Sequence, residues 1–254
     1  MYTVVTGLFD IGRGDWTHFR RPISYYINFF ANVLSLKAPM VIFCEEKFIN
    51  ITKEVREKVP FSTIIIPTSI EQLYMYKYKD LLFEIQKDPN YGKNHPNTTC
   101  PEIAIPLYSL VVSSKPDLLR RGSKYAKTDY CIWLDGGYTH GSINISNITW
   151  TPESLYEIND KISIIGLRPI QDMATQDPIG FSNQYIDIIN GGFFGGHKDT
   201  IEKVIGKYYE IVDEMLTIHR MKEDDQYYWT FLAYRHPELI NLINGSWYDA
   251  FKIK

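Results

Sequence analysis

Short runs of apolar residues recur along the chain, and within each run apolar residues follow one another without alternating with polar ones. Such runs are typical of strands that are covered on both faces in a parallel sheet. The pattern predicts strands over residues 2–9, 39–44, 62–67, 161–167 and 186–190. It also predicts a strand that starts at Tyr130 and ends where Asp135 follows.

Between these runs, the spacing of apolar residues favours helices over residues 25–36, 69–86, 101–114, 200–217 and 225–235. Ser69 and Gln72 have the spacing of a capping box, and Pro237 ends the last helix. Alternating strands and helices predict an α/β sandwich with a central, mostly parallel sheet. No Ser/Gly/Pro-rich linker divides the 254 residues, so we expect a single domain over residues 1–254.

The most informative polar segment follows the strand that starts at Tyr130. It places a carboxylate, two glycines and a histidine in sequence as Asp135, Gly136, Gly137 and His140. Ligands of open α/β sheets bind at the carboxyl ends of the strands. Asp135 therefore suits a divalent cation held against a diphosphate, with His140 as a second metal ligand. A turn or helix-cap role explains one aspartate about equally well.

Three other segments combine residue types that suit an anionic ligand. Residues 10–16 hold two glycines and Arg13, which can grip an anion, but they match neither standard phosphate-loop fingerprint, and a tight turn explains them as well. Residues 190–196 place paired glycines around two phenylalanines, as in a backbone that lies against a ligand. Residues 223–226 hold three adjacent acids, which suit general-base chemistry or simple helix capping.

Composition narrows the class of partner. The net charge is −3 with interspersed signs, which argues against a nucleic-acid partner. Aromatic residues make up 15%, including 19 tyrosines, which fits a carbohydrate or nucleotide binder as well as ordinary packing. The three cysteines form no metal-spaced pair, and no run is long enough to span a bilayer. We expect a cytoplasmic protein, with peripheral membrane association as the remaining option.

Four segments together resemble the HtrL/YibB family of bacterial and viral proteins, and the resemblance runs from end to end. They are residues 4–16, 133–138, 190–196 and 224–226. The resemblance implies a GT-A-like, Rossmann-like fold that binds nucleotide-diphospho-sugars. It also implies a glycosyltransferase. The implied nucleotide-sugar-binding residues are Thr6, Phe9, Asp10, Arg13, Lys115, Trp133, Asn190, Gly191 and Gly192.

The resemblance also implies the chemistry. Asp225 and Asp224 match the acidic pair that faces the anomeric carbon, as general base or as cation stabiliser. The family signature Asp-x-Asp holds Mn²⁺ or Mg²⁺, but only Asp135 remains of it here, so the second ligand is His140, a distant acid or water. The implied reaction moves a sugar from a nucleotide-diphosphate donor, UDP-linked in particular, to a saccharide or glycolipid acceptor in surface-polysaccharide or glycan synthesis. The alternatives are a non-catalytic nucleotide-sugar or carbohydrate-binding module, and a sugar-nucleotide hydrolase or nucleotidyltransferase.

Overall fold

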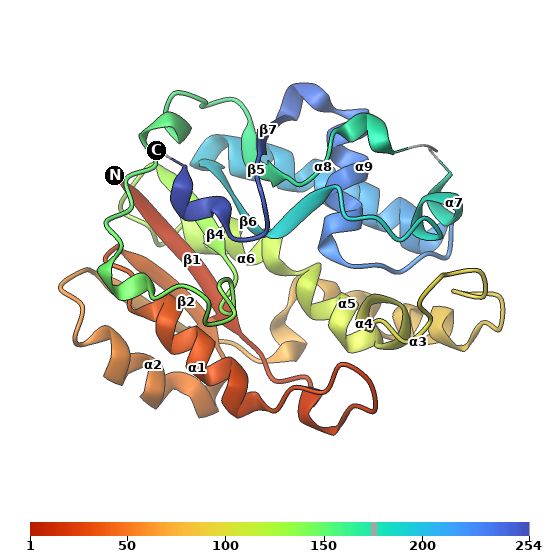
Figure 1. Ribbon diagram of the computed structural model, residues 1–254, viewed down its shortest axis with the longest axis horizontal. Coiled ribbons are helices and arrows are strands. Elements are labelled where there is room, and N and C mark those ends of the chain that lie inside the picture. The colour runs from red at the N-terminus through yellow and green to blue at the C-terminus, as the bar shows by residue number, and fades with distance from the viewer. Residues whose placement is uncertain (174–176, 254) are drawn as a thin grey trace.

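A mixed seven-stranded sheet runs through the centre of the protein in a computed structural model that describes residues 1–173 and 177–253 (Figure 1). Residues 174–176 and 254 of the predicted domain lie outside this range. The strand order is β3-β2-β1-β4-β6-β5-β7. The strands are β1 (Tyr2–Leu8), β2 (Met40–Cys44), β3 (Thr63–Pro67), β4 (Tyr130–Leu134), β5 (Ile162–Gly166), β6 (Ile189–His197) and β7 (Ile240–Asn244).

The direction of β6 decides which residues meet at the edge of the sheet. β1 pairs in parallel with β2 and β4, β2 with β3, and β5 with β7. β6 pairs antiparallel with both β4 and β5. The predicted α/β sandwich with a mostly parallel sheet is therefore confirmed. Because β6 is reversed, its first residues lie at the same edge as the last residues of β1 and β4.

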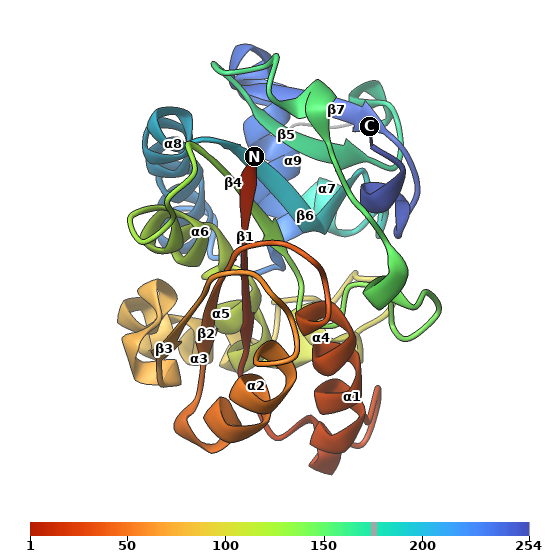
Figure 2. The same cartoon turned by 90° about the vertical axis from the view of Figure 1, so that its left-hand side faces the viewer.

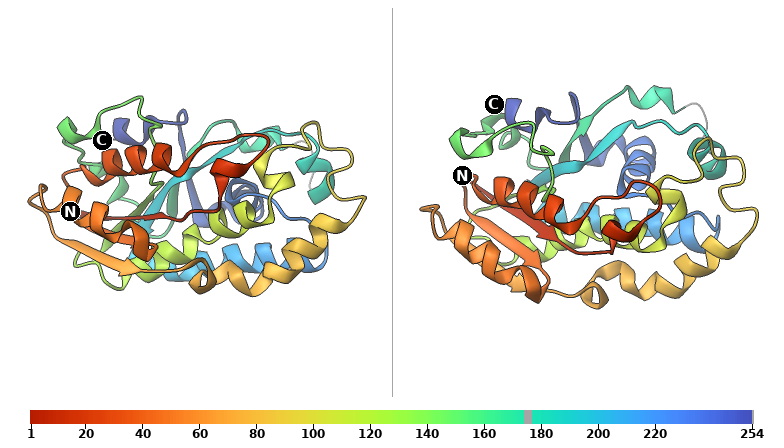
Figure 3. Two further views of the ribbon diagram at one scale, coloured as in Figure 1. Left: turned by 90° about the horizontal axis from the view of Figure 1, so that it is seen from below. Right: turned by 60° about the horizontal axis from the view of Figure 1, so that its bottom comes forward.

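Helices cover both faces of the sheet (Figures 2 and 3). On one face, α6, α8 and α9 contact β1, β4 and β6, and on the other face α2 packs against β3 and α1 packs against α2. Successive strand residues point to opposite faces, so Val5 belongs to the first core and Val4 to the second. The helices are α1 (Ile23–Leu34), α2 (Ile49–Arg56), α3 (Lys79–Lys87), α4 (Pro101–Ala104), α5 (Pro106–Val112), α6 (Lys115–Ser123), α7 (Pro178–Ser182), α8 (Lys198–Thr217) and α9 (Asp225–Arg235).

Two helix predictions were wrong in their continuity. The segment 69–86 starts with two 3-10 turns, Ile70–Gln72 and Tyr74–Tyr78, and becomes α-helical only in α3. Leu73 lies between the two turns and is extended (ψ 145°), which interrupts the helix. The predicted capping box at Ser69 is confirmed, but it caps a 3-10 turn. The segment 101–114 is split into α4 and α5 by Pro106, which holds the preceding residue in an extended conformation.

Several elements were not expected from the pattern. α6 begins at Lys115, where the next residue is a proline suited to a helix start. α2 and β7 were also unexpected, and β7 lies at the edge of the sheet. The predicted strand over residues 186–190 was wrong in its bounds, because β6 starts at Ile189 and includes the glycine-rich segment.

The cysteines and the helix lengths agree with the sequence expectations. Cys44, Cys100 and Cys131 are buried and not bridged. Within the described ranges, none of the helices has both the length and the apolar character that crossing a bilayer requires.

Candidate functional site

A cavity of about 450 Å³ opens at the edge where β1 and β4 end and β6 begins. The backbone amide of Asp135 donates to the carbonyl of Gly192 at 2.9 Å, which joins the end of β4 to the start of β6. Every predicted site residue except Thr6 lines this cavity. They are Phe9, Asp10, Arg13, Lys115, Trp133, Asp135, His140, Asn190, Gly191, Gly192, Asp224 and Asp225.

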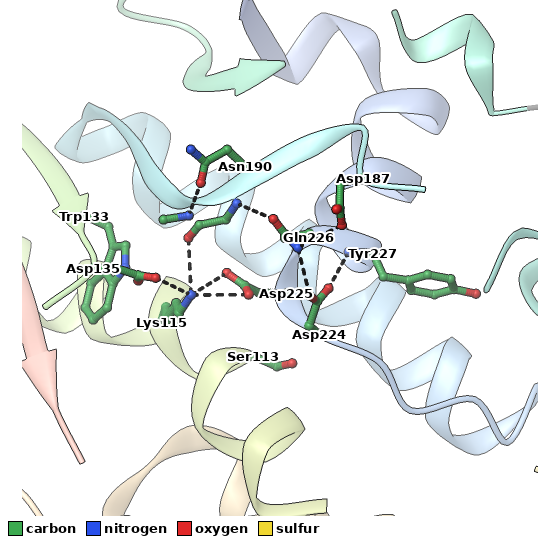
Figure 4. Close-up of polar contacts among 12 residues, drawn as sticks. Ser113, Lys115, Trp133, Asp135, Asp187, Asn190, Asp224, Asp225, Gln226 and Tyr227 are labelled. Atoms are coloured by element: carbon green, nitrogen blue, oxygen red, sulfur yellow. Dashed lines mark hydrogen bonds and ion pairs between the residues drawn. The ribbon is translucent and has the colours of Figure 1, made fainter. Parts of the chain in front are cut away.

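Lys115 lies at the centre of the polar groups in this cavity (Figure 4). Its Nζ is 3.1 Å from Oδ2 of Asp135 and 3.2 Å from Oδ2 of Asp225. It also donates to the carbonyl of Gly191 at 3.4 Å. The three partners come from the residue that follows β4, from α9 and from β6, so one ammonium group contacts segments that are far apart in the sequence.

The charges in this cluster depend on one another. Burial lowers the pKa of Lys115, but Asp135 and Asp225 outweigh it and raise that pKa above its ordinary value, so the ammonium stays charged. Burial raises the pKa of Asp225, and the neighbouring carboxylates add to the effect while Lys115 opposes it. Asp225 is only 2% exposed, so its carboxylate depends on Lys115 for a counter-charge.

The two acids at the start of α9 have different roles. Asp224 is the helix cap, because its carboxylate accepts from the amide of Tyr227 at 3.2 Å. It also accepts from the side chain of Gln226 at 2.9 Å. Asp225 is the first residue of the helix, and its carboxylate contacts Lys115 instead. The capping interpretation therefore holds for Asp224, whereas Asp225 has a charged partner inside the cavity.

The loop after β1 brings a fixed positive charge to the cavity. Gly12 has a φ of 70°, a left-handed conformation that suits glycine, and Arg13 follows it. The Nε of Arg13 donates to the carbonyl of Phe19 at 3.0 Å, and its guanidinium carbon lies 5.1 Å from the centre of the Trp16 ring. It also lies 5.7 and 5.9 Å from the rings of Tyr26 and Tyr108. These contacts fix the guanidinium at the cavity wall.

Asp10 also lines the cavity, but its carboxylate is already paired. Lys47 donates to Oδ2 at 2.9 Å, and the amide of Gly12 donates to Oδ1 at 3.0 Å. Burial raises the pKa of Asp10, but these two bonds outweigh it and lower the pKa. Its interactions support the loop that carries Arg13.

Both predicted metal ligands, Asp135 and His140, have other side chains as partners. Oδ1 of Asp135 accepts from Nε1 of Trp133 at 2.7 Å, and Oδ2 accepts from Lys115. The ring of His140 stacks on Phe29 at 5.6 Å between ring centres, and its Nδ1 lies 3.2 Å from the hydroxyl of Tyr248. Among the described residues, no group of three His, Cys, Asp or Glu side chains is placed to hold a metal ion.

Thr6 and part of the segment 190–196 lie away from the cavity. Thr6 is fully buried within β1 and does not line the cavity. Of the segment 190–196, only Asn190, Gly191 and Gly192 reach the cavity, and the remainder runs along β6 inside the sheet. Gly195 has a packing role, because a Cβ there would lie 2.6 Å from the carbonyl oxygen of Cys131.

Several cavity residues were missed by the sequence reasoning. Arg21 adds a second arginine beside Arg13, and Asp187 adds a carboxylate whose pKa is raised to about 6 by burial and by the charge of Asp224. A charged residue inside an otherwise apolar run was the only signal for Asp187. Further aromatic and polar residues that the sequence reasoning did not assign to the site also line the cavity: Tyr26, Glu102, Tyr108, Tyr185, Trp247 and Tyr248.

The fold and the cavity define an α/β protein with a polar, charge-lined site at the carboxyl edge of a mixed sheet. The chain belongs to the HtrL_YibB family, described as bacterial proteins of unknown function, and the match spans residues 1–254. It is 26% identical to Protein HtrL of Escherichia coli strain K12, over 98% of this chain and 91% of that protein.

Two solved structures are also similar. One is mouse xyloside xylosyltransferase 1 in its apo form, with a TM-score of 0.45, 13% identity, and coverage of 95% of this chain and 84% of that chain. The other is 4-diphosphocytidyl-2C-methyl-D-erythritol synthase from Anaerococcus prevotii, with a TM-score of 0.42, 13% identity, and coverage of 99% and 91%.

Proposed function

We propose that this protein is a glycosyltransferase that moves a sugar from a nucleotide-diphosphate donor to a saccharide or glycolipid acceptor. The supporting observation is that one cavity holds the cations Arg13, Arg21 and Lys115 together with the buried carboxylate of Asp225. A diphosphate requires positive charge, and a reacting sugar carbon requires a carboxylate nearby. A uridine diphosphate sugar is the first candidate donor, and surface-polysaccharide or glycan synthesis is the expected context.

The leaving diphosphate gains negative charge as the bond to the sugar carbon breaks. Fixed cations aimed at that charge stabilise the transition state most when water is excluded. Arg13 is held in place by three aromatic rings and the carbonyl of Phe19, and Lys115 is only 12% exposed. Both groups are therefore positioned before the donor arrives, which avoids a reorganisation cost during the reaction.

Asp225 is the proposed acid–base residue. If the reaction inverts the sugar configuration, Asp225 accepts the proton of the acceptor hydroxyl as that oxygen attacks. If the reaction retains the configuration, its carboxylate stabilises the positively charged sugar ring instead. A carboxylate whose pKa is raised by burial is a better proton acceptor near neutral pH than an exposed one, which suits the first role.

The rim of the cavity suits a saccharide. Tyr185 and Trp247 line it and are 48% and 43% exposed, respectively. Exposed aromatic rings stack on the apolar faces of sugars while their polar edges remain solvated. The acceptor is proposed to bind against these rings, close to Asp187 and Gln226.

The test is a panel of nucleotide sugars, each followed by thermal shift and by release of nucleoside diphosphate with and without an oligosaccharide acceptor. The expected result is stabilisation by one donor and release of its nucleoside diphosphate. Asp225→Asn should keep the thermal shift but lose release, because its role concerns the transition state. Asp199→Asn is the matched control, since that carboxylate is 94% exposed and outside the cavity.

Other outcomes identify the alternatives. Stabilisation by a donor without any release, even with acceptors present, supports a non-catalytic nucleotide-sugar-binding module. Release that proceeds equally without an acceptor supports a sugar-nucleotide hydrolase. No stabilisation by any nucleotide sugar refutes both the transferase and the binding module.

A further inference from the structure

The surroundings of the Lys115 ammonium group are those expected for a bound cation. Its nitrogen is within 3.4 Å of two carboxylates, Asp135 and Asp225, and of the carbonyl oxygen of Gly191. Carboxylate and carbonyl oxygens gathered from several segments are also what a hard divalent cation requires. In this protein the position at their centre is taken by a side chain of the chain itself (Figure 4).

The same contacts leave little room for a second cation on these carboxylates. Oδ2 of Asp135 accepts from Lys115 and Oδ1 accepts from Trp133, so both oxygens have donors. A divalent ion on Asp135 would stand beside the positive charge of Lys115, whose side chain is only 12% exposed, and the two would repel. The nearby His140 is engaged with Phe29 and Tyr248.

We propose that the Lys115 ammonium takes the place of a divalent metal ion, so that this protein binds a nucleoside diphosphate and supports sugar transfer without a metal. This inference rests on the proposed transferase function. An ammonium has three N–H groups, and the contact with the carbonyl of Gly191, at 3.4 Å, is one of its longest. That N–H turns to a phosphate oxygen when the donor binds.

The transfer step balances without a further reactant. The bond between the sugar carbon and the phosphate oxygen breaks, and the diphosphate leaves with the electron pair, facing Lys115 and Arg13. A bond forms between the same carbon and the acceptor oxygen. In the inverting case, the acceptor proton moves to the carboxylate of Asp225, and in the retaining case it moves to the leaving diphosphate. Lys115 supplies charge only and keeps its proton throughout.

The first experiment measures binding of uridine, guanosine, cytidine and thymidine diphosphates by calorimetry, in EDTA and again with excess Mn²⁺ or Mg²⁺. We expect the best-bound nucleotide to have affinities that agree within about threefold in the two conditions. A loss of tenfold or more in EDTA overturns the inference while leaving the proposed function in place. If none of the four binds in either condition, the proposed function fails instead.

The second experiment follows free Mn²⁺ by its electron paramagnetic resonance signal and needs no nucleotide. The native protein should leave the signal unchanged, whereas Lys115→Ala should reduce it, because Asp135 and Asp225 are then free to bind the ion. Lys124→Ala is the matched control, since Lys124 adjoins the same helix but is 67% exposed. Mn²⁺ binding by the native protein that is abolished by Asp135→Asn overturns the inference.

The two measurements combine in the Lys115→Ala variant. Its nucleotide affinity should fall about tenfold or more in EDTA and recover partly when Mn²⁺ is added, which a merely structural role of Lys115 would not produce. A variant with native affinity in EDTA overturns the inference. If the variant does not fold, the native protein's affinities in EDTA and Mn²⁺ still decide the question.

Discussion

Replacing Gly191 with alanine tests the position of Asp225 without changing any charged group. Gly191 lies near the start of β6, directly beside the Asp225 carboxylate. A Cβ at residue 191 would lie 2.7 Å from Cγ of Asp225 and closer still to Oδ2. Ordinary contacts between such atoms are about 3.5 Å. The carboxylate must therefore retreat by roughly 1 Å.

The size of the effect follows from the contacts that the retreat would break. The two oxygens of Asp225 are 3.2 and 3.4 Å from Nζ of Lys115, so a displacement of about 1 Å takes both beyond hydrogen-bonding distance. A misplacement of this size in a reacting group costs about 100-fold in rate. The packing strain should lower the free energy of unfolding by about 1–3 kcal/mol.

The assay compares nucleoside diphosphate release and donor-induced thermal shift for Gly191→Ala and the native protein. We expect release to fall about 100-fold, while the thermal shift produced by the donor changes little. Gly206→Ala is the matched control, because a Cβ there meets no atom within 4 Å. A folded Gly191→Ala protein with release within threefold of native would refute the proposed role of Asp225.

Gly206→Ala, in the exposed part of α8, should raise the free energy of unfolding in urea by about 0.5–1 kcal/mol, and a decrease would contradict the helix assignment. Arg13→Ala should weaken nucleoside diphosphate binding about 10-fold or more by calorimetry, and unchanged affinity would remove Arg13 from the site. The guanidinium of Arg56 donates to the carbonyls of residues 34, 36 and 38, and Arg56→Met leaves these carbonyls without their buried donor. The free energy of unfolding in urea should fall by about 3 kcal/mol, and a fall of less than about 1 kcal/mol would refute the proposed role of Arg56. Burial and Asp224 raise the pKa of Glu223 from 4.5 to about 8, so this group makes the native protein lose stability as pH rises from about 5 to 8, and Glu223→Gln should lose less. The difference in their unfolding free energies should therefore change by up to about 4 kcal/mol over that range, and parallel stability curves would refute the shift.

The sequence by itself determined the elements whose signals are local. Continuous apolar runs predicted the strands β1 to β5 closely, because strands covered on both faces exclude polar residues. The last helix was predicted with the bounds that α9 has, because Asp224 caps it and Pro237 lies just beyond its end. The candidate residues were found because glycines and acids that follow strands stand out from the apolar pattern.

Only the tertiary structure decided how these residues meet. No local pattern shows that β6 runs antiparallel between β4 and β5, and this reversal places Gly191 beside both Asp225 and Lys115. The start of α6 at Lys115 and the return of Trp247 to the cavity are equally invisible along the chain. The physical reason is that hydrophobic periodicity records which face of an element is buried, whereas strand order and direction depend on contacts between residues far apart in sequence.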